Sequence, residues 1–556
     1  MEGAMKLVIV GGVAGGASAA ARARRLSETA EIVVFERGPE PSFANCGLPY
    51  YIGGEIRERE KLLVAKLEVL QRRYRLDVRT GTEVVAIDRP NRQVVARRLA
   101  DGETYRESYD ALILAPGAAP VRPPIPGIEL PGVFTLRNLE DSDRIKATLE
   151  QGVRRAVLVG AGFIGLELAE NLVRRGVETT VVELQDQVLP PLDREMTTPI
   201  LQELRQRGVR VFLGDSAESI APQEGGLSVA LRSGRSVAAE LVVLGVGVRP
   251  ESRLAVEAGL AVGPRGGIQV DDRMRTSDPA IFAVGDAVEV RDFVAGAPAQ
   301  VPLAGPANRQ GRIAADNVFG RDSRYRGTQG TSIVGVFNVV AAITGQSEKA
   351  LRRAGTSYQK VYIHANHHAS YYPGARPLSI KAVFDPSGGK LYGAQVVGEK
   401  GVANRINVFA MAIQAGMTVF DLEEAELAYA PQFGSAKDPV NLVGFVAANL
   451  VRGDYPQVSV EEWEMGGDDR APLIDVRTPR EYEAGRIPGA INIPLEELRN
   501  RLSEIPRNRP VVVHCQVGMR GYMATLVLRQ NGFEAANLAG GYKTYRLFHP
   551  EDEAVS

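Results

Sequence analysis

The stretch Lys6-Leu7-Val8-Ile9-Val10-Gly11-Gly12-Val13-Ala14-Gly15-Gly16 decides the fold of the N-terminal part of this chain. It predicts a buried parallel strand and a glycine-rich turn, with a helix over residues 17–26. A second strand, residues 32–35, ends in Glu36. A helix N-terminus can hold a pyrophosphate, and a carboxylate at that strand end can accept both ribose hydroxyls of an adenosine. The pattern predicts a dinucleotide-binding βαβ unit, although Val13 replaces the middle glycine of G-x-G-x-x-G.

A second glycine-rich turn is complete. Gly160-Ala161-Gly162-Phe163-Ile164-Gly165 follows a strand at residues 156–159 and precedes a helix over residues 166–175. The next strand, residues 179–182, ends in Glu183. A carboxylate there bonds the 2′-hydroxyl of NADH and repels the 2′-phosphate of NADPH. Because two such units are far more specific than one, the sequence predicts two nucleotide sites, the second preferring NADH.

The composition limits the classes of protein to which this chain can belong. At 556 residues the chain should form several domains. Its 66 basic and 67 acidic residues are balanced, so we expect neither nucleic acid nor an anionic membrane surface as partner. No apolar run reaches the about 18 residues of a membrane span. Two cysteines cannot form a disulfide framework, and the start shows no signal-peptide pattern, so we expect a cytoplasmic address.

Cys46 is the expected centre of the chemistry. It lies in Ser42-Phe43-Ala44-Asn45-Cys46-Gly47-Leu48-Pro49-Tyr50, shortly after the first nucleotide-binding unit. Tyr51 stands five residues later, so the loop holds no partner thiol, and Cys46 would cycle with an external sulfur or oxygen as a mixed disulfide, persulfide or sulfenic acid. We expect a cationic or dipolar setting that lowers its pKa. The alternative is a buried structural cysteine.

Two further segments carry a family resemblance. Residues 112–117 predict a strand ending in a tight turn, and residues 276–287 predict a strand ending in Asp286. With the first unit they resemble the FAD domain of two-dinucleotide flavoprotein disulfide reductases. For FAD the resemblance implies Gly11, Ala14, Gly16, Glu36, Arg37, Val84, Ala115, Gly117, Asp286 and Ala304. For NADH it implies Gly160, Gly162, Phe163, Ile164, Gly165, Glu183 and Gly247.

Disulfide reductases of this superfamily usually carry two cysteines in C-x4-C. The Cys46 segment resembles that of coenzyme A-disulfide reductases and their persulfide-reducing relatives. The resemblance covers residues 5–450 and implies that CoA contacts Ser18, Arg22, Arg25, Ser42, Asn45, Arg73, Asn308 and Lys437. Guanidinium groups suit the phosphates of CoA. We interpret Arg24 alone as part of a solvated helix face. Asn308 stands where some family members carry histidine.

From about residue 331 the pattern lacks nucleotide motifs. In the resembling family this part is a dimerisation domain that completes the partner's active site, which implies a homodimer. Tyr371 and Tyr429 would then reach the other protomer's Cys46 region and act as weak acids, or alternatively serve as interface anchors. His364, His367 and His368 lack the spacing of a metal site, so we predict no metal.

The C-terminal part begins a new α/β unit. A strand at residues 511–514 leads into the loop Cys515-Gln516-Val517-Gly518-Met519-Arg520-Gly521 and a helix. Successive backbone N–H groups of such a loop form an anion-binding nest, so Cys515 should be a stabilised thiolate or persulfide. The last hundred residues resemble a single-domain rhodanese. That resemblance implies that Asp475 and Arg477 brace the loop and Arg520 steers anionic sulfur donors; an inactive rhodanese fold is the alternative.

These patterns predict an α/β chain with two Rossmann-like three-layer dinucleotide-binding domains, an α+β dimerisation domain and a C-terminal α/β rhodanese domain. The expected boundaries are 1–120 and 250–330 for the FAD domain, 121–249 for the NADH domain, 331–450 for the dimerisation domain, 451–470 for a linker, and 471–556 for the rhodanese domain.

The expected function is NADH-driven, FAD-dependent reduction of CoA persulfide, polysulfide and CoA disulfide through Cys46, with Cys515 carrying sulfane sulfur. Two hypotheses compete with it. One is an NADH oxidase or peroxidase that uses a Cys46 sulfenic acid. The other is a non-enzymatic sulfur carrier or redox sensor, which complete glycine turns and both adenosine carboxylates disfavour.

Overall fold

The computed structural model describes residues 5–550, and residues 1–4 and 551–556, the outer ends of the first and last expected domains, lie outside the described part. The chain forms two compact units. Unit 1 comprises Met1–Asp186 and Arg207–Gly330, and unit 2 comprises Gln187–Gln206 and Thr331–Ser556. Across residues 5–550 no helix is both long and apolar enough to cross a membrane.

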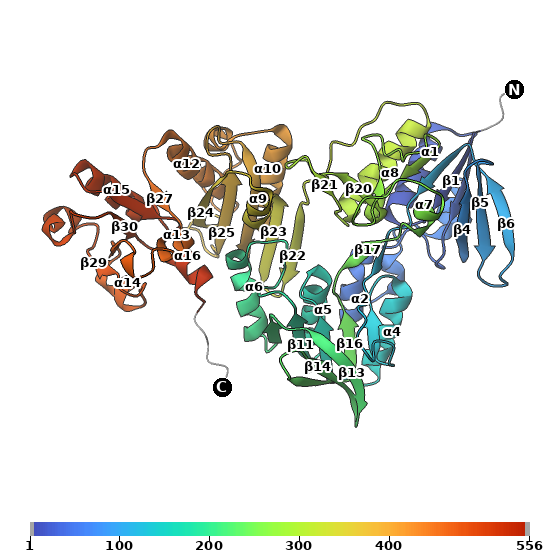
Figure 1. The fold of residues 1–556 in the computed structure, drawn as a ribbon, viewed down its shortest axis with the longest axis horizontal. Helices are drawn as coiled ribbons and strands as arrows, with labels where there is room; N and C mark the ends of the chain where they lie inside the picture. The colour runs from blue at the N-terminus through green and yellow to red at the C-terminus, as the bar shows by residue number, and fades with distance from the viewer. Residues whose placement is uncertain (1–4, 551–556) are drawn as a thin grey trace. The chain divides into compact units, whose positions relative to one another are not determined.

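The first sheet of unit 1 is parallel, with strand order β19-β7-β1-β2-β3. Its strands and main helices are β1 (Lys6–Val10), β2 (Glu31–Phe35), β3 (Asp77–Arg79), β7 (Ala111–Leu114), β19 (Ile281–Ala283), α1 (Ala14–Leu26) and α8 (Ala304–Val318). Helices α1 and α8 lie side by side (Figure 1). A Cβ on Gly311 would lie 2.2 Å from the carbonyl oxygen of Gly15, so these glycines let the two helices approach closely.

β1 is the central strand of this sheet. It pairs with β2 on one side and β7 on the other, and Val8 opposite Val33 sets the register. Val8 is fully buried, as expected for a parallel strand covered on both faces. A strand from which the sheet extends in both directions leaves a crevice at its carboxyl end. The first glycine-rich turn stands at that crevice.

The second sheet of unit 1 repeats this plan with strand order β12-β11-β10-β16-β9. Its elements are β9 (Val133–Thr135), β10 (Arg155–Val159), β11 (Glu178–Glu183), β12 (Arg210–Leu213), β16 (Leu241–Leu244), α4 (Leu139–Glu150) and α5 (Phe163–Arg174). The antiparallel sheet of β13 (Ala217–Gln223), β14 (Gly226–Leu231) and β15 (Ser236–Ala239) packs its apolar side chains against it.

The remaining elements of unit 1 lie outside these sheets. They are η1 (Asn45–Gly47), α2 (Leu48–Gly53), η2 (Arg59–Leu62), α3 (Leu67–Arg72), β4 (Thr82–Asp88), β5 (Gln93–Arg98), β6 (Thr104–Ser108), β8 (Ala118–Pro120), β17 (Val248–Pro250), α7 (Arg253–Glu257), β18 (Ile268–Gln269), η3 (Gly285–Ala287), β20 (Val288–Arg291) and β21 (Pro298–Ala299).

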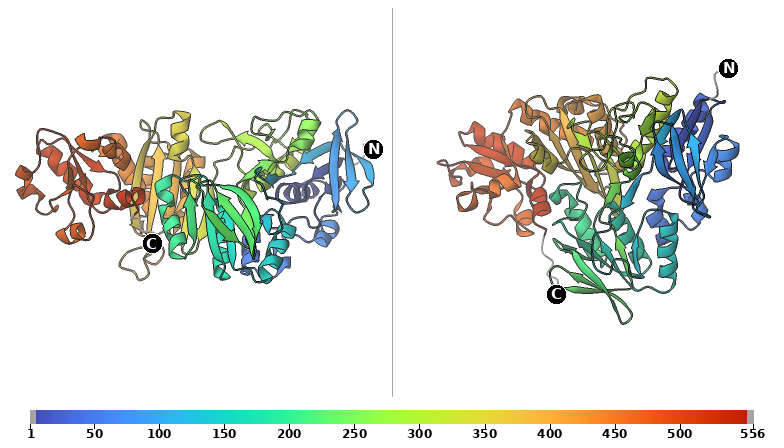
Figure 2. Two further views of the ribbon diagram at one scale, coloured as in Figure 1. Left: turned by 60° about the horizontal axis from the view of Figure 1, so that its bottom comes forward. Right: turned by 45° about the vertical axis from the view of Figure 1, so that its right-hand side comes forward.

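Unit 2 contains an antiparallel sheet with strand order β22-β23-β26-β25-β24 and a C-terminal parallel sheet with strand order β27-β31-β30-β28-β29 (Figure 2). The first comprises β22 (Ser332–Val336), β23 (Val339–Gly345), β24 (Gln359–Asn366), β25 (Pro377–Phe384) and β26 (Leu391–Gly398), with α6 (Arg194–Gln206), α9 (Glu348–Ala354), α10 (Val402–Ala415), α11 (Val419–Glu424) and α12 (Pro439–Arg452).

The C-terminal sheet carries the Cys515 loop at the end of its central strand β30. Its elements are β27 (Gln457–Val458), α13 (Val460–Glu464), η4 (Gly467–Asp469), β28 (Leu473–Asp475), α14 (Pro479–Glu483), β29 (Ile491–Asn492), η5 (Leu498–Asn500), η6 (Leu502–Glu504), β30 (Val511–His514), α15 (Met519–Gln530), β31 (Ala535–Leu538) and α16 (Gly541–Phe548).

The expected mixed α/β class is confirmed, but several element bounds differ. The strand expected over residues 276–287 shortens to β19, and Asp286 lies in η3 after it. α1 begins at Ala14 and α5 at Phe163, because the last glycine of each turn already belongs to the first helical turn. Residues 457–464, expected in a linker, form β27 and α13, and β27 pairs with β31 of the C-terminal sheet.

Candidate active site

The first glycine-rich turn is shaped by its glycines. Gly11 has φ +96°, and a Cβ on it would lie 2.1 Å from the carbonyl oxygen of Ala115. A Cβ on Gly16 would lie 1.8 Å from the Gly11 oxygen. Glu36 accepts one backbone N–H on each carboxylate oxygen, from Gly12 and Gly38, both at 2.7 Å. Each oxygen keeps acceptor capacity for a hydroxyl, so the turn fits an adenosine dinucleotide.

The second turn has the same construction. Gly160 has φ +107°, and a Cβ on Gly165 would lie 2.1 Å from the Gly160 oxygen. A Cβ on Gly162 would meet nothing within 4 Å, which is the open approach that a pyrophosphate needs. Glu183 accepts the N–H of Ala161 at 2.7 Å, as Glu36 accepts that of Gly12. The residues of this turn therefore also fit a dinucleotide.

The Cys46 loop is tied to the first turn by its start. Ser42 is buried in the left-handed region at φ +54°, and its N–H donates to the carbonyl oxygen of Gly12 at 2.8 Å. Asn45 donates to the carbonyl oxygen of Arg137 at 3.1 Å. Cys46 is exposed in η1 and leads directly into α2. The loop is therefore anchored beside the turn that Glu36 closes.

Packing of α2 along α5 brings Cys46 toward the second turn. The Tyr50 hydroxyl donates to Glu167 at 3.3 Å, and Arg175 donates to the carbonyl oxygen of Ile52 at 2.9 Å. Both helices thus begin at the same end of the contact. α5 begins at the Gly160–Gly165 turn, and α2 begins directly after Cys46. The arrangement places the thiol at the end of α5 that carries the second nucleotide turn.

The expected lowering of the Cys46 pKa is wrong for this structure. Its pKa is raised, first because protein atoms partly desolvate the sulfur and then because the Glu167 and Asp286 carboxylates lie nearby; a backbone hydrogen bond acts in the opposite direction. Burial, with a contribution from Glu170, raises the pKa of Glu167 itself to about 7. The thiol therefore faces negative charge, which disfavours the thiolate.

The remaining predicted FAD and NADH residues fall around the two turns. Desolvation raises the pKa of Asp286, which lies in η3. Arg37 is exposed and pairs with Glu251 at 3.4 Å. The other positions are a buried Val84 in β4, Ala115 and Gly117 after β7, Ala14 and Ala304 at the starts of α1 and α8, Phe163 and Ile164 at the start of α5, and Gly247 at φ +102°.

The predicted CoA contacts are only partly gathered. Ser18 of α1 donates to Asn308 of α8 at 2.6 Å, and Arg22 pairs with Asp316 at 2.7 Å. Arg25 and Arg73 are exposed in unit 1, and Lys437 is exposed in unit 2. The structure therefore brings Ser18, Arg22 and Asn308 to the α1–α8 pair, and the CoA role of this set stays a prediction.

The interpretation of Arg24 as a solvated residue is wrong. Its side chain is buried and donates to four backbone carbonyl oxygens, those of Tyr74, Ser27, Glu28 and Arg75, each at 2.9 Å. These bonds satisfy carbonyl groups at the end of α1 and in the following loops. Arg24 is a structural residue, and a run of four residues with three arginines could not reveal which guanidinium is buried.

The two tyrosines of unit 2 lie together. The hydroxyl groups of Tyr371 and Tyr429 are 2.7 Å apart, and the side chains are 73% and 47% exposed. The hydrogen bond between them raises the pKa of Tyr371. The nearby His364 is hydrogen-bonded to Ser379 and Thr544 at 2.8 Å each. The approach of the tyrosines to a partner's Cys46 remains a prediction.

Hydrogen bonds hold the Cys515 loop in place. Cys515 is 1% exposed, and its Sγ accepts the N–H of Gly518 at 3.2 Å. Arg477 donates to Asp475 at 2.6 Å and to Gln516 of the loop at 3.1 Å, an arrangement consistent with the expected bracing. Arg520 is paired with Glu481 at 2.6 and 2.8 Å instead of being free for a ligand.

Two residues that flank this loop, Glu481 and His514, could not be assigned from the sequence motifs. Glu481 is the third residue of a capping box with Thr478, a pattern visible in Thr478-Pro479-Arg480-Glu481. His514 is fully buried, 3.5 Å from Asp475, and burial lowers its pKa to about 4. No local signal identifies His514, because its environment is built by β28 and β30 together.

One group of carboxylates in the described residues lies close enough to hold a metal: Asp193, Glu195 and Glu348 of unit 2. The ammonium of Lys381 stands among them, 2.9 Å from Asp193 and 2.5 Å from each glutamate. This lysine is 1% exposed. The group is therefore an ion-pair cluster in which a side chain supplies the cation.

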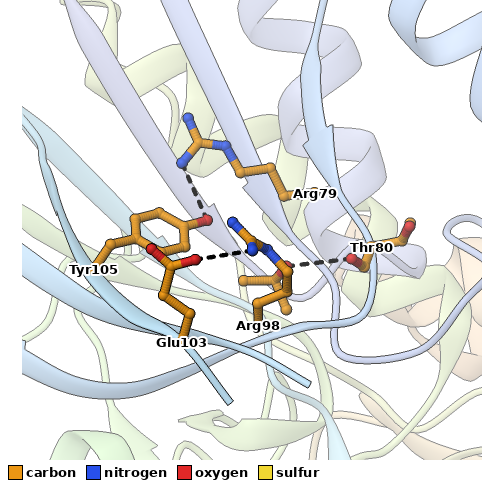
Figure 3. A pocket seen from close by; sticks show the side chains of 6 residues that line it. Arg79, Thr80, Arg98, Glu103 and Tyr105 are labelled. Atoms are coloured by element: carbon orange, nitrogen blue, oxygen red, sulfur yellow. Dashed lines mark hydrogen bonds and ion pairs between the residues drawn. The ribbon is translucent and has the colours of Figure 1, made fainter. Parts of the chain in front are cut away.

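A pocket at the β4–β6 sheet contains none of the predicted site residues. Figure 3 shows Arg79 and Arg98 directed at other side chains of the pocket rather than into open space. Arg79 pairs with Asp77 and Glu107, and Arg98 pairs with Asp101 and Glu103. Because both guanidinium groups are neutralised, the pocket offers no net positive charge to an anion.

Three family models match the chain. The description "Pyridine nucleotide-disulphide oxidoreductase" matches residues 5–311, its dimerisation domain matches residues 331–438, and "Rhodanese-like domain" matches residues 460–547. The first match alone covers more than half of the 556 residues. The matched segments contain both glycine-rich turns, Cys46, the tyrosine pair and Cys515.

Individual proteins are similar over most of the chain. The coenzyme A disulfide reductase of Staphylococcus aureus is 36% identical over 80% of this chain and 99% of its own length. The crystal structure of reduced CoADR-RHD of Bacillus anthracis shares 48% identity over 99% of both chains, with a TM-score of 0.97. The structure of an NAD-dependent persulfide reductase from A. fulgidus shares 38% identity over 97% of this chain and 100% of its own, with a TM-score of 0.91.

Proposed function

Because this chain belongs to the pyridine nucleotide-disulphide oxidoreductase family, we propose that it reduces CoA persulfide, polysulfide and CoA disulfide with NADH through the single cysteine Cys46. An NAD(P)H- and FAD-dependent reductase of sulfur groups, carrying a rhodanese domain, follows from the family. The substrates, the preference for NADH and the roles of individual residues are the proposal.

The observation that carries the proposal is the position of Cys46 between the two nucleotide turns. Its loop is bonded to the first turn through Ser42, and α2 lies along the helix that starts at the second turn. When bound, FAD would supply two-electron transfer from the nicotinamide to sulfur. With no second cysteine in its loop, Cys46 must form its disulfide with the substrate.

The thiol chemistry assigned to Cys46 balances for each substrate. With a CoA substrate, its thiolate attacks the sulfur that bears the CoA arm, forming a Cys46–CoA mixed disulfide and releasing hydrosulfide from a persulfide or a CoA thiolate from a disulfide. Two electrons and a proton then return the Cys46 thiolate and free CoA. With polysulfide, the thiolate takes a terminal sulfur as a Cys46 persulfide and releases the shortened polysulfide, and two electrons and a proton return the thiolate and hydrosulfide. Tyr371 and Tyr429, presented by the partner subunit in a homodimer, would give a proton to the leaving sulfur.

The nucleotide and CoA assignments have separate support. Glu183, buried at the end of β11, disfavours the 2′-phosphate of NADPH by charge. The exposed guanidinium groups of Arg25 and Arg73 are available to CoA phosphates. Cys515 would carry sulfane sulfur, and we retain the expected domain boundaries except that of the linker, because β27 pairs within the C-terminal sheet. Both cysteines are free thiols, so we place the protein in the reducing cytoplasm.

The decisive experiment compares the parent protein with Cys46→Ser and Cys515→Ser. With NADH we expect the parent to release sulfide from CoA persulfide and polysulfide and thiol from CoA disulfide. Cys46→Ser should lose all three activities, and Cys515→Ser should keep reduction of CoA persulfide in part. Persistence of all three activities in Cys46→Ser would refute the proposal.

Two measurements separate the competing hypotheses. Rapid NADH-dependent oxygen or peroxide consumption without a sulfur substrate would favour the oxidase or peroxidase. Failure of NADH to bleach the flavin under anaerobic conditions would favour a non-enzymatic sulfur carrier or sensor. We expect slow oxygen consumption and prompt bleaching.

A further inference from the structure

The positive charge of Arg520 is cancelled by a neighbouring helix. Both carboxylate oxygens of Glu481 in α14 accept from this guanidinium, at 2.6 and 2.8 Å. Chiefly because of this bond, the pKa of Glu481 falls to about 2, so the pair carries both charges at neutral pH. Glu481 also closes the capping box with Thr478, which holds its carboxylate in place. An anion that approaches Cys515 therefore meets an ion pair instead of a free guanidinium.

A second arginine that contacts the loop is also hydrogen-bonded within the protein. Arg477 is 1% exposed and bonds Asp475, Gln516 and the carbonyl oxygen of Gly485. The backbone N–H of Lys543 donates to the carbonyl oxygen of Gln516 at 2.9 Å. Neither Arg477 nor Arg520 therefore offers a free guanidinium to a small inorganic dianion.

The most exposed side chains of the loop are apolar. Val517 and Met519 of the loop and Met523 of α15 are 37%, 58% and 48% exposed. Met519 and Met523 are four residues apart on one helix, so they share a face. Methionine side chains adapt to irregular apolar partners. Val517, Met519 and Met523 thus form an apolar lip that suits the carbon chain of a thiol carrier. Their side chains offer no hydrogen-bond donor to sulfonate oxygens.

We propose that Cys515 takes its sulfur from organic persulfides whose carbon arm packs on Met519 and Met523, and that Glu481 is the specificity-determining residue that disfavours small inorganic dianions such as thiosulfate. This inference rests on the proposed role of Cys515 as a sulfur carrier. The Cys515 thiolate attacks the outer sulfur of R–S–SH, the S–S bond breaks, and R–S⁻ leaves and takes a proton from solvent. The outer sulfur keeps its proton and becomes the Cys515 persulfide, so no oxidant or reductant is needed.

The test uses the full chain with Cys46→Ser, which leaves Cys515 as its only cysteine. Each protein is mixed with thiosulfate or with an alkyl persulfide, and the gain of one sulfur atom is followed by intact-protein mass spectrometry. This yields a loading rate constant for each donor without NADH. A parent protein that loads from neither donor would refute the carrier role itself, which separates that failure from failure of the specificity argument.

Glu481→Gln should raise the thiosulfate rate constant about tenfold, because it frees the Arg520 charge within a few ångström of the donor while glutamine keeps the cap. Glu483→Gln, which removes a charge from an exposed residue of the same helix, is the matched control and should change it less than about twofold. In the Glu481→Gln/Arg520→Gln double variant the gain should disappear.

Met519→Ser tests the apolar lip independently of the charge pair. It should lower the ratio of persulfide to thiosulfate rate constants about threefold, because it removes apolar contact from one donor only. The specificity proposal is overturned if Glu481→Gln leaves thiosulfate loading unchanged, if the double variant keeps the gain, or if Met519→Ser slows both donors equally. Should Glu481→Gln lower the melting temperature sharply, the Met519 ratio still decides the assignment of the donor.

Discussion

Cys46 is a thiol in a site with negative charge. Glu167 lies in α5, Asp286 in η3 and Cys46 in η1, so the field at the sulfur is assembled from three separate parts of unit 1. Glu167 has a pKa raised to about 7. Its carboxylate is therefore mostly protonated below that pH and charged above it, and it opposes thiolate formation most strongly in alkaline solution.

We therefore expect Glu167→Gln to lower the Cys46 pKa, since it removes a nearby like charge. The measurement is the pH dependence of alkylation of Cys46 by iodoacetamide in a Cys515→Ser protein, where it is the only thiol. Glu55→Gln, at an exposed residue of the same unit, is the control. An unchanged or higher Cys46 pKa would show that Glu167 does not raise it.

At the scale of elements, the contact between α2 and α5 positions the thiol. Gly53 is the last residue of α2, and a Cβ on it would lie 1.9 Å from Oδ1 of Asn171 in α5. The close approach of the two helices therefore requires glycine at this position.

Gly53→Ala should force the helices apart and cost about 1–3 kcal/mol, with a fall in NADH-dependent persulfide reduction because Cys46 moves with α2. Chemical denaturation and steady-state rates provide the two readouts. Asn171→Ala removes the obstructing amide, so the double variant should recover part of both losses. A Gly53→Ala protein with parental stability and activity would contradict this role of the contact.

The ion cluster of unit 2 joins α6, α9 and β25 around Lys381. Burial pushes the pKa of Asp193 and Glu348 upward, but the Lys381 ammonium outweighs it and both pKa values are lowered. Carboxylates with lowered pKa values stabilise the fold above their unfolded pKa of about 4, and this contribution is lost as the pH falls through the folded values.

Lys381→Met should destabilise the protein by about 3–5 kcal/mol at neutral pH, because it leaves buried carboxylates without their cation. The loss should shrink in acid, where those carboxylates are protonated. Glu461→Gln removes a partly exposed partner of Lys360 in the same network and should cost less than about 1 kcal/mol. Urea titrations at neutral and acid pH give both values; equal losses for the two variants would contradict the argument.

At the scale of the whole molecule, the proposed active site needs two chains. Tyr371 and Tyr429 meet at an exposed position of unit 2, within a segment that matches a dimerisation domain. If one chain supplies Cys46 and its partner supplies the tyrosines, two differently defective chains can form one intact site in a symmetric dimer.

Mixing Cys46→Ser chains with Tyr371→Phe/Tyr429→Phe chains under exchange should therefore restore about a quarter of the parental activity, since half of the random dimers are mixed and each has one complete site. Native mass spectrometry verifies the mixed dimers, and each variant alone is the baseline. Mixed dimers with no activity above that baseline would place both functions on one chain.

The sequence by itself determined the two βα turns, their carboxylates, the lone Cys46 and the Cys515 loop, because glycine conformations, strand ends and cysteine spacing are local properties of the chain. Only the tertiary structure decided the sign of the Cys46 pKa shift, the burial of Arg24, the Lys381 cluster and the pairing of Arg520 with Glu481. These features depend on charges and carbonyl groups that meet through space from distant segments, and electrostatic interaction follows distance in the fold rather than separation along the chain.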